Sequence, residues 1–244
     1  MERKKTTVLV AGSWGTALAL VLADNGHDVT LWTRNAEQAD EINGRHTNSR
    51  FLADAELPPG IRAVTDMGEA LKGADMALFV APSAAMREVA RLAAPHLEKT
   101  TLVVHATKGF ETESLKRMST VLAEELFRDE RGIVCLSGPS HAEEVIVRHP
   151  TTVVVASPNS EHAQAAQDYF MNGSYFRVYT NPDLIGVETS GAVKNIIALG
   201  AGLSDGLGFG DNAKAALVTR GLAEIARLGG AMGWIGLAAV VSCG

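Results

Sequence analysis

The stretch Val10-Ala11-Gly12-Ser13-Trp14-Gly15-Thr16-Ala17 joins an apolar run at residues 6–11 to an apolar stretch with helical character. This order of strand, tight turn and helix start is the setting of the dinucleotide-binding fingerprint G-x-G-x-x-G. Glycines there let the backbone approach a pyrophosphate, and the helix start offers unpaired N–H groups and a positive dipole end. Gly12 and Gly15 fill the second and third glycine positions, whereas Val10 occupies the first. We therefore predict a dinucleotide site whose turn is strained and whose cofactor affinity is weakened.

Short β-branched runs alternate with longer amphipathic stretches as far as residue 179. The expected strands are residues 6–11, 28–33, 76–81, 101–106, 132–136, 152–156 and 176–179. The expected helices are residues 14–25, 36–43, 84–96, 114–127 and 161–170. Several of the strands are apolar throughout, as in a sheet that helices cover on both faces. This alternation predicts an α/β fold with a Rossmann-like, doubly wound and mostly parallel sheet.

The pattern changes near residue 185, where the strand signals stop. Residues 188–203 and 213–228 have helical patterns, and the glycine-rich segment 204–212 is expected to connect them as a loop. We place a domain boundary near residue 186. Residues 1–186 are expected to form the dinucleotide-binding domain, and residues 187–244 part of a helical substrate and catalytic domain.

The chain is acidic, with a formal net charge of −6 over 244 residues, and its basic side chains are dispersed. This balance argues against a nucleic-acid binder, which usually carries a basic stripe. Cys135 and Cys243 have no paired spacing, so we expect neither a disulfide framework nor a metal site. The N-terminus lacks a secretory signal, so we expect a cytoplasmic protein. The uncharged, glycine-interrupted stretch after Arg227 is interpreted as core helix and loop rather than a membrane span.

The second strand is expected to end at Leu31-Trp32-Thr33-Arg34-Asn35, with no acidic residue at its tip. An acidic group there would bind the 2′-hydroxyl of NAD and repel the 2′-phosphate of NADP. Arg34 instead suits the phosphate, and its planar guanidinium can stack on adenine. We therefore favour NADP(H) as the cofactor, with NAD(H) as the alternative. A solvated surface arginine is the other interpretation of Arg34.

Four further segments combine polar residues with glycine or proline. They are His105-Ala106-Thr107-Lys108-Gly109, Leu136-Ser137-Gly138-Pro139-Ser140-His141-Ala142-Glu143-Glu144, Arg177-Val178-Tyr179-Thr180-Asn181-Pro182-Asp183 and Ser190-Gly191-Ala192-Val193-Lys194-Asn195. With residues 11–18 and 204–227, they resemble, in the same order, the bacterial NAD(P)-dependent glycerol-3-phosphate dehydrogenase family. The resemblance covers residues 6 to about 233. It implies reduction of dihydroxyacetone phosphate to sn-glycerol 3-phosphate for glycerophospholipid synthesis.

The resemblance also implies which residues bind the cofactor. In the family, the residues at Ser13 and Trp14 contact the cofactor, and a basic residue at the position of Arg34 meets its adenosine end. The residue at Ala142 contacts the cofactor as well. Lys108, in the T-K-G turn, would reach both the cofactor and the substrate.

For the substrate, the resemblance implies contacts from Gly138 and Ser140 and a catalytic Lys194 that gives and takes a proton. The chemistry agrees, because a carbonyl oxygen that becomes an alkoxide needs a cation or a proton donor beside it. Lys194 lies in an otherwise apolar stretch, where burial would lower a lysine pKa toward neutrality. His105 and His141 have no carboxylate partner or metal spacing that the sequence identifies, so we interpret them as structural or peripheral.

The resemblance is expected to stop after Gly233. The family continues with a G-L-x-G-x-G-D-L motif, whose Asp assists the catalytic Lys, and an S-R-N motif, whose Arg grips the substrate phosphate. Gly236-Leu237-Ala238 is the candidate remnant of the first motif, and neither that Asp nor that Arg follows. The sequence therefore leaves open a catalytically impaired dinucleotide-binding relic. Another dehydrogenase with a helical second domain is a third interpretation, against which the segments 137–144 and 181–195 argue. Apolar helix faces left without partners would favour self-association, so a homodimer is one assembly we consider.

Overall fold

The computed structural model describes residues 3–234, and within them eight strands form one sheet in the order β10-β9-β8-β7-β6-β1-β2-β5. The strands of this sheet are β1 Lys5–Leu9, β2 Asp28–Trp32, β5 Ile61–Val64, β6 Met76–Phe79, β7 Leu102–His105, β8 Ile133–Ser137, β9 Thr151–Ala156 and β10 Phe176–Asn181. All neighbouring strands pair in parallel except β8 and β9. The Rossmann-like, mostly parallel sheet predicted from the sequence is therefore confirmed.

The topology brings the predicted site segments to one edge of the sheet. From β1 the chain builds outward through β2 and β5, and then returns to place β6 on the other side of β1. The strand order thus reverses between β1 and β6, where open α/β sheets bind their ligands beyond the carboxyl ends of the strands. Val10, Lys108 and Gly138 follow β1, β7 and β8, respectively, on this edge.

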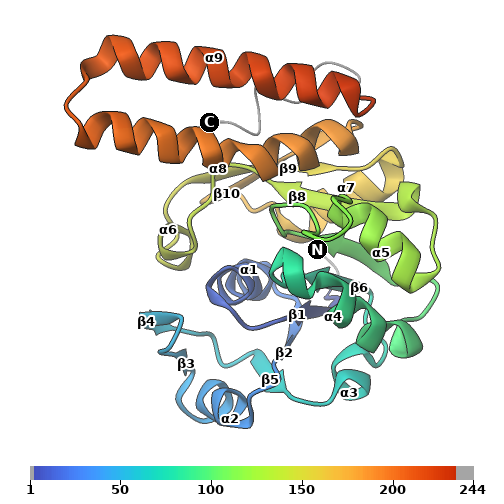
Figure 1. Cartoon of the computed structure of the whole chain (residues 1–244). Coiled ribbons are helices and arrows are strands. Elements are labelled where there is room, and N and C mark those ends of the chain that lie inside the picture. Colours follow the sequence, from blue (N-terminus) through green and yellow to red (C-terminus); the bar gives the residue numbers. More distant parts are fainter. Residues whose placement is uncertain (1–2, 235–244) are drawn as a thin grey trace.

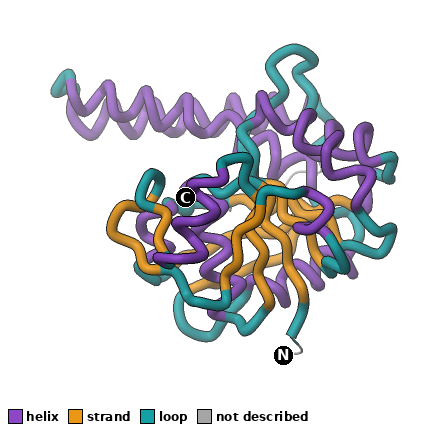
Figure 2. Tube along the Cα trace, turned by 90° about the horizontal axis from the view of Figure 1, so that it is seen from below, coloured by secondary structure: helices purple, strands orange, loops and turns teal. Residues whose placement is uncertain are grey.

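Helices cover both faces of the sheet, as Figures 1 and 2 show. One apolar core joins a sheet face to α1 (Ser13–Asp24), α2 (Ala36–Arg45), α6 (Ala142–Ile146) and α7 (Ser160–Phe170). A second core joins the opposite face to α3 (Met67–Leu71), α4 (Met86–Ala93) and α5 (Met118–Leu126). Burial on both faces explains why the central strands are apolar throughout.

Polar side chains at the helix starts fix where several helices begin. The carboxamide oxygen of Asn35 accepts from Gln38 N at 3.1 Å at the start of α2, and Asp183 accepts from Gly186 N at 2.9 Å at the start of α8. Such caps satisfy N–H groups that the first helical turn leaves without partners. Asp66 and Asn159 cap α3 and α7 in the same way.

Several local expectations were wrong. The sequence patterns missed β5, α3, α6 and the small antiparallel pair of β3 (Thr47–Asn48) and β4 (Leu52–Glu56). Residues 114–117 belong to a turn rather than to the helix expected from residue 114, because Phe110 and Arg117 pair as an antiparallel bridge. The helix expected at 84–96 is divided into α4 and two short 3-10 turns, Ser83–Ala85 and Ala94–His96.

Beyond the sheet, α8 (Leu184–Gly206) and α9 (Gly210–Ala231) form a long antiparallel pair (Figure 1). The expected loop at 204–212 was wrong, since only Leu207, Gly208 and Phe209 separate the two helices. The first half of α8 is buried against the sheet, whereas Ile196, Leu199 and Leu203 further along are 62–76% exposed. Among the described helices, none is long and apolar enough to cross a membrane.

Candidate active site

The turn after β1 has the features that a pyrophosphate needs. Gly12 caps α1 without a side-chain hydrogen bond, and the first turn of this helix contains no acidic residue. The N–H groups of that turn therefore face a site that is electrostatically open to an anion. A Cβ on Gly12 would meet no atom within 4 Å, whereas a Cβ on Gly15 would lie 2.2 Å from the Val10 carbonyl oxygen. Gly15 thus permits the close packing of helix on strand, and the turn fits a dinucleotide.

Val10 adopts a φ of +87°, a backbone conformation that is strained for a β-branched residue. This is the position at which the fingerprint normally has its first glycine. The sequence-based expectation of a strained turn is therefore confirmed. A weakened cofactor affinity stays a prediction.

Two polar side chains that the sequence patterns missed hold this turn in place. Asn48 Nδ2 donates to the Ala11 carbonyl at 3.0 Å and to Thr16 Oγ1 at 2.8 Å. Gln38 Nε2 donates to the same carbonyl at 2.7 Å. A buried asparagine beside an edge hairpin gives no local sequence signal, because its partners lie more than thirty residues away.

The other expected cofactor residues surround the same turn. Ser13 Oγ donates to the Phe51 carbonyl at 3.1 Å, and Trp14 packs against the core below α1. Ala142 begins α6, which packs alongside α1. These positions lie on the elements that border the switch between β1 and β6, as a dinucleotide site requires.

Arg34 lies just beyond β2, with its guanidinium 5.7 Å from the ring centre of Trp32. Its Nη2 atom lies 3.0 Å from Glu88 Oε1, and both side chains are more than half exposed. Glu88 belongs to α4 and was not predicted as a site residue. The structure thus places a carboxylate beside the group that we expected to meet the adenosine end of the cofactor.

The two predicted site lysines meet at one backbone oxygen. Lys108 Nζ donates to the Gly138 carbonyl at 3.1 Å, and Lys194 Nζ donates to it at 3.3 Å. Gly138 has a φ of +143°, and a Cβ there would lie 3.0 Å from Val153 Cα. Only glycine fits this conformation and this close approach, so the Ser-Gly-Pro-Ser turn can present its carbonyl to both ammonium groups.

Burial and the charge of Lys194 lower the pKa of Lys108 from 10.5 to about 8. Burial acts because a low-dielectric environment disfavours the charged form, and Lys194 adds repulsion between like charges. A lysine with such a pKa can exchange protons near neutral pH.

Helix α8 reaches this site because Gly191 lets it approach β8 closely. A Cβ on Gly191 would lie 2.7 Å from Ser137 Oγ and 3.9 Å from Lys108 Cγ. Among the described residues, no hydrogen-bond partner is found for the buried Ser137 hydroxyl. The contact is therefore steric, and it brings Lys194 to the end of the sheet.

A cavity of about 590 Å³ opens beside the two lysines. The polar and charged side chains on its wall are Lys108, Ser140, His141, Glu144, Lys194 and Asn195. Ser140 Oγ donates to the Gly138 carbonyl at 3.4 Å. Apolar residues of α8 and α9, among them Ile197, Val218 and Ile225, complete the wall. A cavity of this size suits a small molecule, and the two ammonium groups favour an anionic one.

His105 has a carboxylate neighbour that the sequence did not identify, and its interpretation as structural or peripheral stays a prediction. His105 is fully buried, and its Nε2 atom lies 3.1 Å from Glu188 Oε1. Glu188 belongs to α8, so the pairing joins segments that lie far apart in the sequence. His141 is mostly exposed and lies 3.9 Å from the exposed Glu143, which is a surface arrangement.

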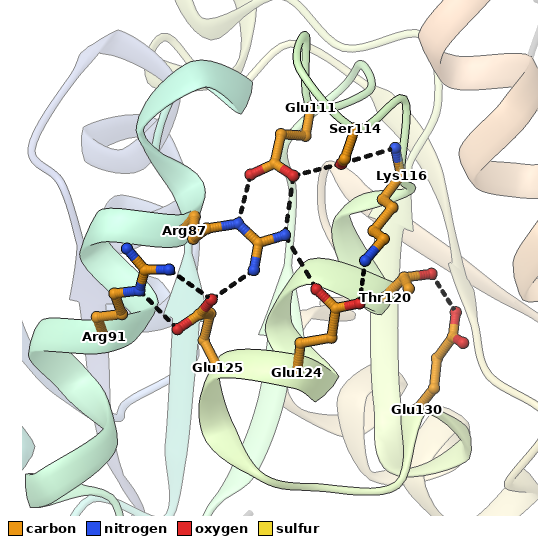
Figure 3. A network of polar contacts seen from close by, with 9 residues as sticks. All are labelled: Arg87, Arg91, Glu111, Ser114, Lys116, Thr120, Glu124, Glu125 and Glu130. Atoms are coloured by element: carbon orange, nitrogen blue, oxygen red, sulfur yellow. Dashed lines mark hydrogen bonds and ion pairs between the residues drawn. The ribbon is translucent and has the colours of Figure 1, made fainter.

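The turn that follows Lys108 is anchored by ion pairs (Figure 3). Arg87 of α4 contacts Glu111 through Nε at 2.6 Å and Nη2 at 2.8 Å, and it also contacts Glu124 and Glu125 of α5. Hydrogen bonds from Arg87 lower the pKa of Glu111 to about 2. A paired guanidinium of this kind ties the turn to the two helices that flank it.

Comparisons with known proteins agree with this arrangement. Residues 5–163 match the family model described as the NAD-dependent glycerol-3-phosphate dehydrogenase N-terminus, and residues 183–244 match the model of its C-terminus. The match therefore continues past Gly233, where we expected the resemblance to stop. The candidate remnant at residues 236–238 lies outside the described residues.

Two curated relatives are both named "Glycerol-3-phosphate dehydrogenase [NAD(P)+]". The protein of Geobacillus thermodenitrificans is 59% identical over 93% of this chain and 66% of its own length. That of Enterococcus faecalis is 56% identical over 98% of this chain and 72% of its own length. The chain thus spans about two thirds of the length of these relatives.

A solved structure gives the same result for the fold. The crystal structure of glycerol-3-phosphate dehydrogenase from Coxiella burnetii superposes with a TM-score of 0.88 at 40% identity, and the alignment covers 99% of this chain and 74% of that one. This similarity and the two family models together argue against a dehydrogenase of another family. The chain belongs to the NAD-dependent glycerol-3-phosphate dehydrogenase family.

Proposed function

We propose that this chain reduces dihydroxyacetone phosphate to sn-glycerol 3-phosphate, with NADP(H) favoured over NAD(H) as the hydride carrier. The observation that carries the proposal is the convergence of Lys108 and Lys194 on the Gly138 carbonyl, at the wall of a cavity of about 590 Å³. Two ammonium groups beside one oxygen provide what a carbonyl needs as it gains negative charge.

Different residues of the site have different roles in the proposed reaction. Bound at the turn of Gly12 and Gly15, the nicotinamide cofactor supplies the hydride. Lys194 is proposed to give its proton to the carbonyl oxygen of the substrate as the adjacent carbon is reduced, so that the product leaves as an alcohol. Lys108 stabilises the same oxygen, and apolar residues of α8 and α9 line the other side of the cavity.

The predicted substrate contacts fit a small phosphorylated ketone. Gly138 and Ser140 lie directly beside both lysines, and the cavity is walled by polar groups on one side and apolar ones on the other. A phosphate handle would add binding energy that holds the reacting carbonyl in place. An impaired relic is not favoured, because both lysines remain in contact with one oxygen.

The proposed use of the product is the synthesis of glycerophospholipids, and the proposed place is the cytoplasm. The buried free thiol of Cys135 fits a reducing compartment. The boundary near residue 186 and a homodimer also stay proposals, since the exposed apolar side chains of α8 would favour self-association.

The test is an assay of NADPH oxidation with dihydroxyacetone phosphate, compared with unphosphorylated dihydroxyacetone. We expect turnover with the phosphate ester and much slower turnover without the phosphate. Measurable NADPH binding without turnover of either ketone would overturn the proposal.

A further inference from the structure

A buried carboxylate lies between the segments that carry the two site lysines. Glu188 is 7% exposed and occupies the first half of α8, six residues before Lys194. Its Oε1 atom accepts from Ser119 N at 2.8 Å and lies 3.1 Å from His105 Nε2. Its Oε2 atom accepts from Arg117 Nη1 at 2.6 Å and lies 2.6 Å from Ser119 Oγ. Both oxygens are therefore fully used.

Each partner of Glu188 belongs to a segment that positions the site. His105 ends β7, three residues before Lys108. Arg117 closes the turn that begins after Lys108, and Ser119 lies in the first turn of α5. One carboxylate thus links the end of β7, the start of α5 and the helix that carries Lys194.

Stability alone gives a poor reason for this arrangement. Burial pushes the pKa of Glu188 upward, but the neighbouring His105 and Arg117 favour the ionised carboxylate and outweigh burial, so the pKa lies below its ordinary value. A buried charge carries a large desolvation cost, and apolar side chains of similar volume often stabilise a fold as well or better. A charge that accepts three hydrogen bonds does fix geometry, because each hydrogen bond restricts the position of the helix.

We propose that Glu188 is a positioning residue, which fixes α8 against β7 and α5 so that Lys108 and Lys194 share the Gly138 oxygen. It acts through the backbone segments that bear the two lysines. The kinetic part of this inference rests on the proposed dehydrogenase function, whereas the structural part does not.

The decisive variant is Glu188→Gln, which keeps the size of the side chain and removes its charge. We expect NADPH affinity to change less than kcat, because Lys108 is the one expected cofactor contact on a segment that Glu188 holds, and the cofactor turn lies on β1 and α1. We expect kcat to fall about 100-fold with a smaller change in KM, because a displacement of about 1 Å at a reacting group has that effect. An unchanged kcat would overturn the inference.

The matched control is Asp24→Asn. Asp24 ends α1 and accepts from Arg148 Nε at 2.8 Å and from Tyr175 Oη at 2.8 Å, so the control also converts a carboxylate that holds an arginine and a hydroxyl into an amide. We expect it to lower the melting temperature while leaving kcat unchanged. Equal falls of kcat in the control and in Glu188→Gln would show a purely structural role and would overturn the inference.

If Glu188→Gln does not fold, Ser119→Ala takes its place. It removes the hydroxyl that contacts Glu188, Glu130 and Arg117, and it keeps the backbone N–H donor to Glu188. A smaller fall in kcat would support the inference, and an unchanged kcat would overturn it.

Crystal structures of the wild type and the folded variant give a reading that does not depend on turnover. We expect the Lys194 Nζ to Gly138 O distance to lengthen in the variant, and an unchanged distance would overturn the inference. An inactive wild type would overturn the proposed function alone, because this distance could still be compared.

Discussion

Lys108 and Lys194 donate to the same backbone oxygen, that of Gly138, at 3.1 and 3.3 Å, although they come from a strand end and from a helix of a different part of the chain. Burial lowers the pKa of Lys108, and the repulsion between the two ammonium groups helps to lower it. Gly191 lets α8 approach β8 closely, and the buried Glu188 joins the same helix to Arg117 and Ser119.

Removing one lysine should change the titration of the other. In Lys194→Met we expect the pKa of Lys108 to rise from about 8, yet to stay below 10.5, because burial, the larger cause, remains. The measurement is the pH dependence of Lys108 acylation, followed by mass spectrometry. Lys214 on α9 is the control, and its profile should be the same in both proteins. A pKa of Lys108 that does not move would contradict the prediction.

The same pKa makes stability depend on pH in a defined direction. Between about pH 8 and 10.5 the unfolded chain binds a proton at Lys108 that the folded chain has lost, so the contribution of this group to stability rises with pH. Below about pH 8 Lys108 is protonated in both the folded and the unfolded chain, so the destabilising effect of burying its charge is fully present. In Lys194→Met this rise should span a narrower pH window, which urea unfolding at several pH values can measure.

Gly191→Ala should push α8 away from β8, because the new Cβ would lie 2.7 Å from Ser137 Oγ. We expect a loss of about 1–3 kcal/mol in the free energy of unfolding, as in overpacked cores. Adding Ser137→Ala should recover most of the loss, since it removes the clashing atom. Gly202→Ala on the same helix is the control: a Cβ there meets no atom within 4 Å, so it should stabilise slightly. If the changes in unfolding free energy caused by Gly191→Ala and Ser137→Ala simply add in the double variant, the contact between these two residues does not determine the position of α8.

Val10 offers a direct measure of backbone strain. Val10→Ala and Val10→Gly both remove the side chain beyond Cβ, but only glycine relieves the φ of +87°. We expect the free energy of unfolding of Val10→Gly to exceed that of Val10→Ala by about 1 kcal/mol. Elsewhere in regular structure the alanine variant is usually the more stable one. Urea unfolding of both variants makes the comparison. NADPH should also bind more tightly to Val10→Gly, and an alanine variant of equal or greater stability would refute the strain.

The parts of the fold and of the site that could be predicted from the sequence are those whose sequence pattern reports on local structure. The turn of Gly12 and Gly15 and the apolar strands were identified because glycine spacing and β-branched runs report directly on backbone and burial. The hairpin of β3 and β4 was missed because its strands are short and polar. The expected loop at 204–212 was wrong because glycine composition suggested a loop, whereas packing between α8 and α9 extends both helices. At the site, Lys108 and Lys194 followed from family motifs. The contact of Glu188 with His105 could not be predicted, because it joins distant segments.

The pairing of Arg34 with Glu88 should influence cofactor choice. A carboxylate 3.0 Å from Arg34 competes with the 2′-phosphate of NADPH for the guanidinium and repels that phosphate. Glu88→Gln should therefore strengthen NADPH binding about two- to fivefold, the range for an exposed charge pair, and leave NADH binding unchanged. Glu69→Gln, which breaks the exposed pair with Arg62, is the control. An equal change in affinity for NADPH and NADH would show that Glu88 does not influence which cofactor is bound.

We propose that Lys194 gives the proton that completes carbonyl reduction. The most direct measurement is the single-turnover rate of NADPH oxidation by the wild type and by Lys194→Met at saturating dihydroxyacetone phosphate. We expect a rate about 10²–10⁴-fold lower in the variant, with NADPH affinity unchanged. A variant that oxidises NADPH as fast as the wild type would contradict it.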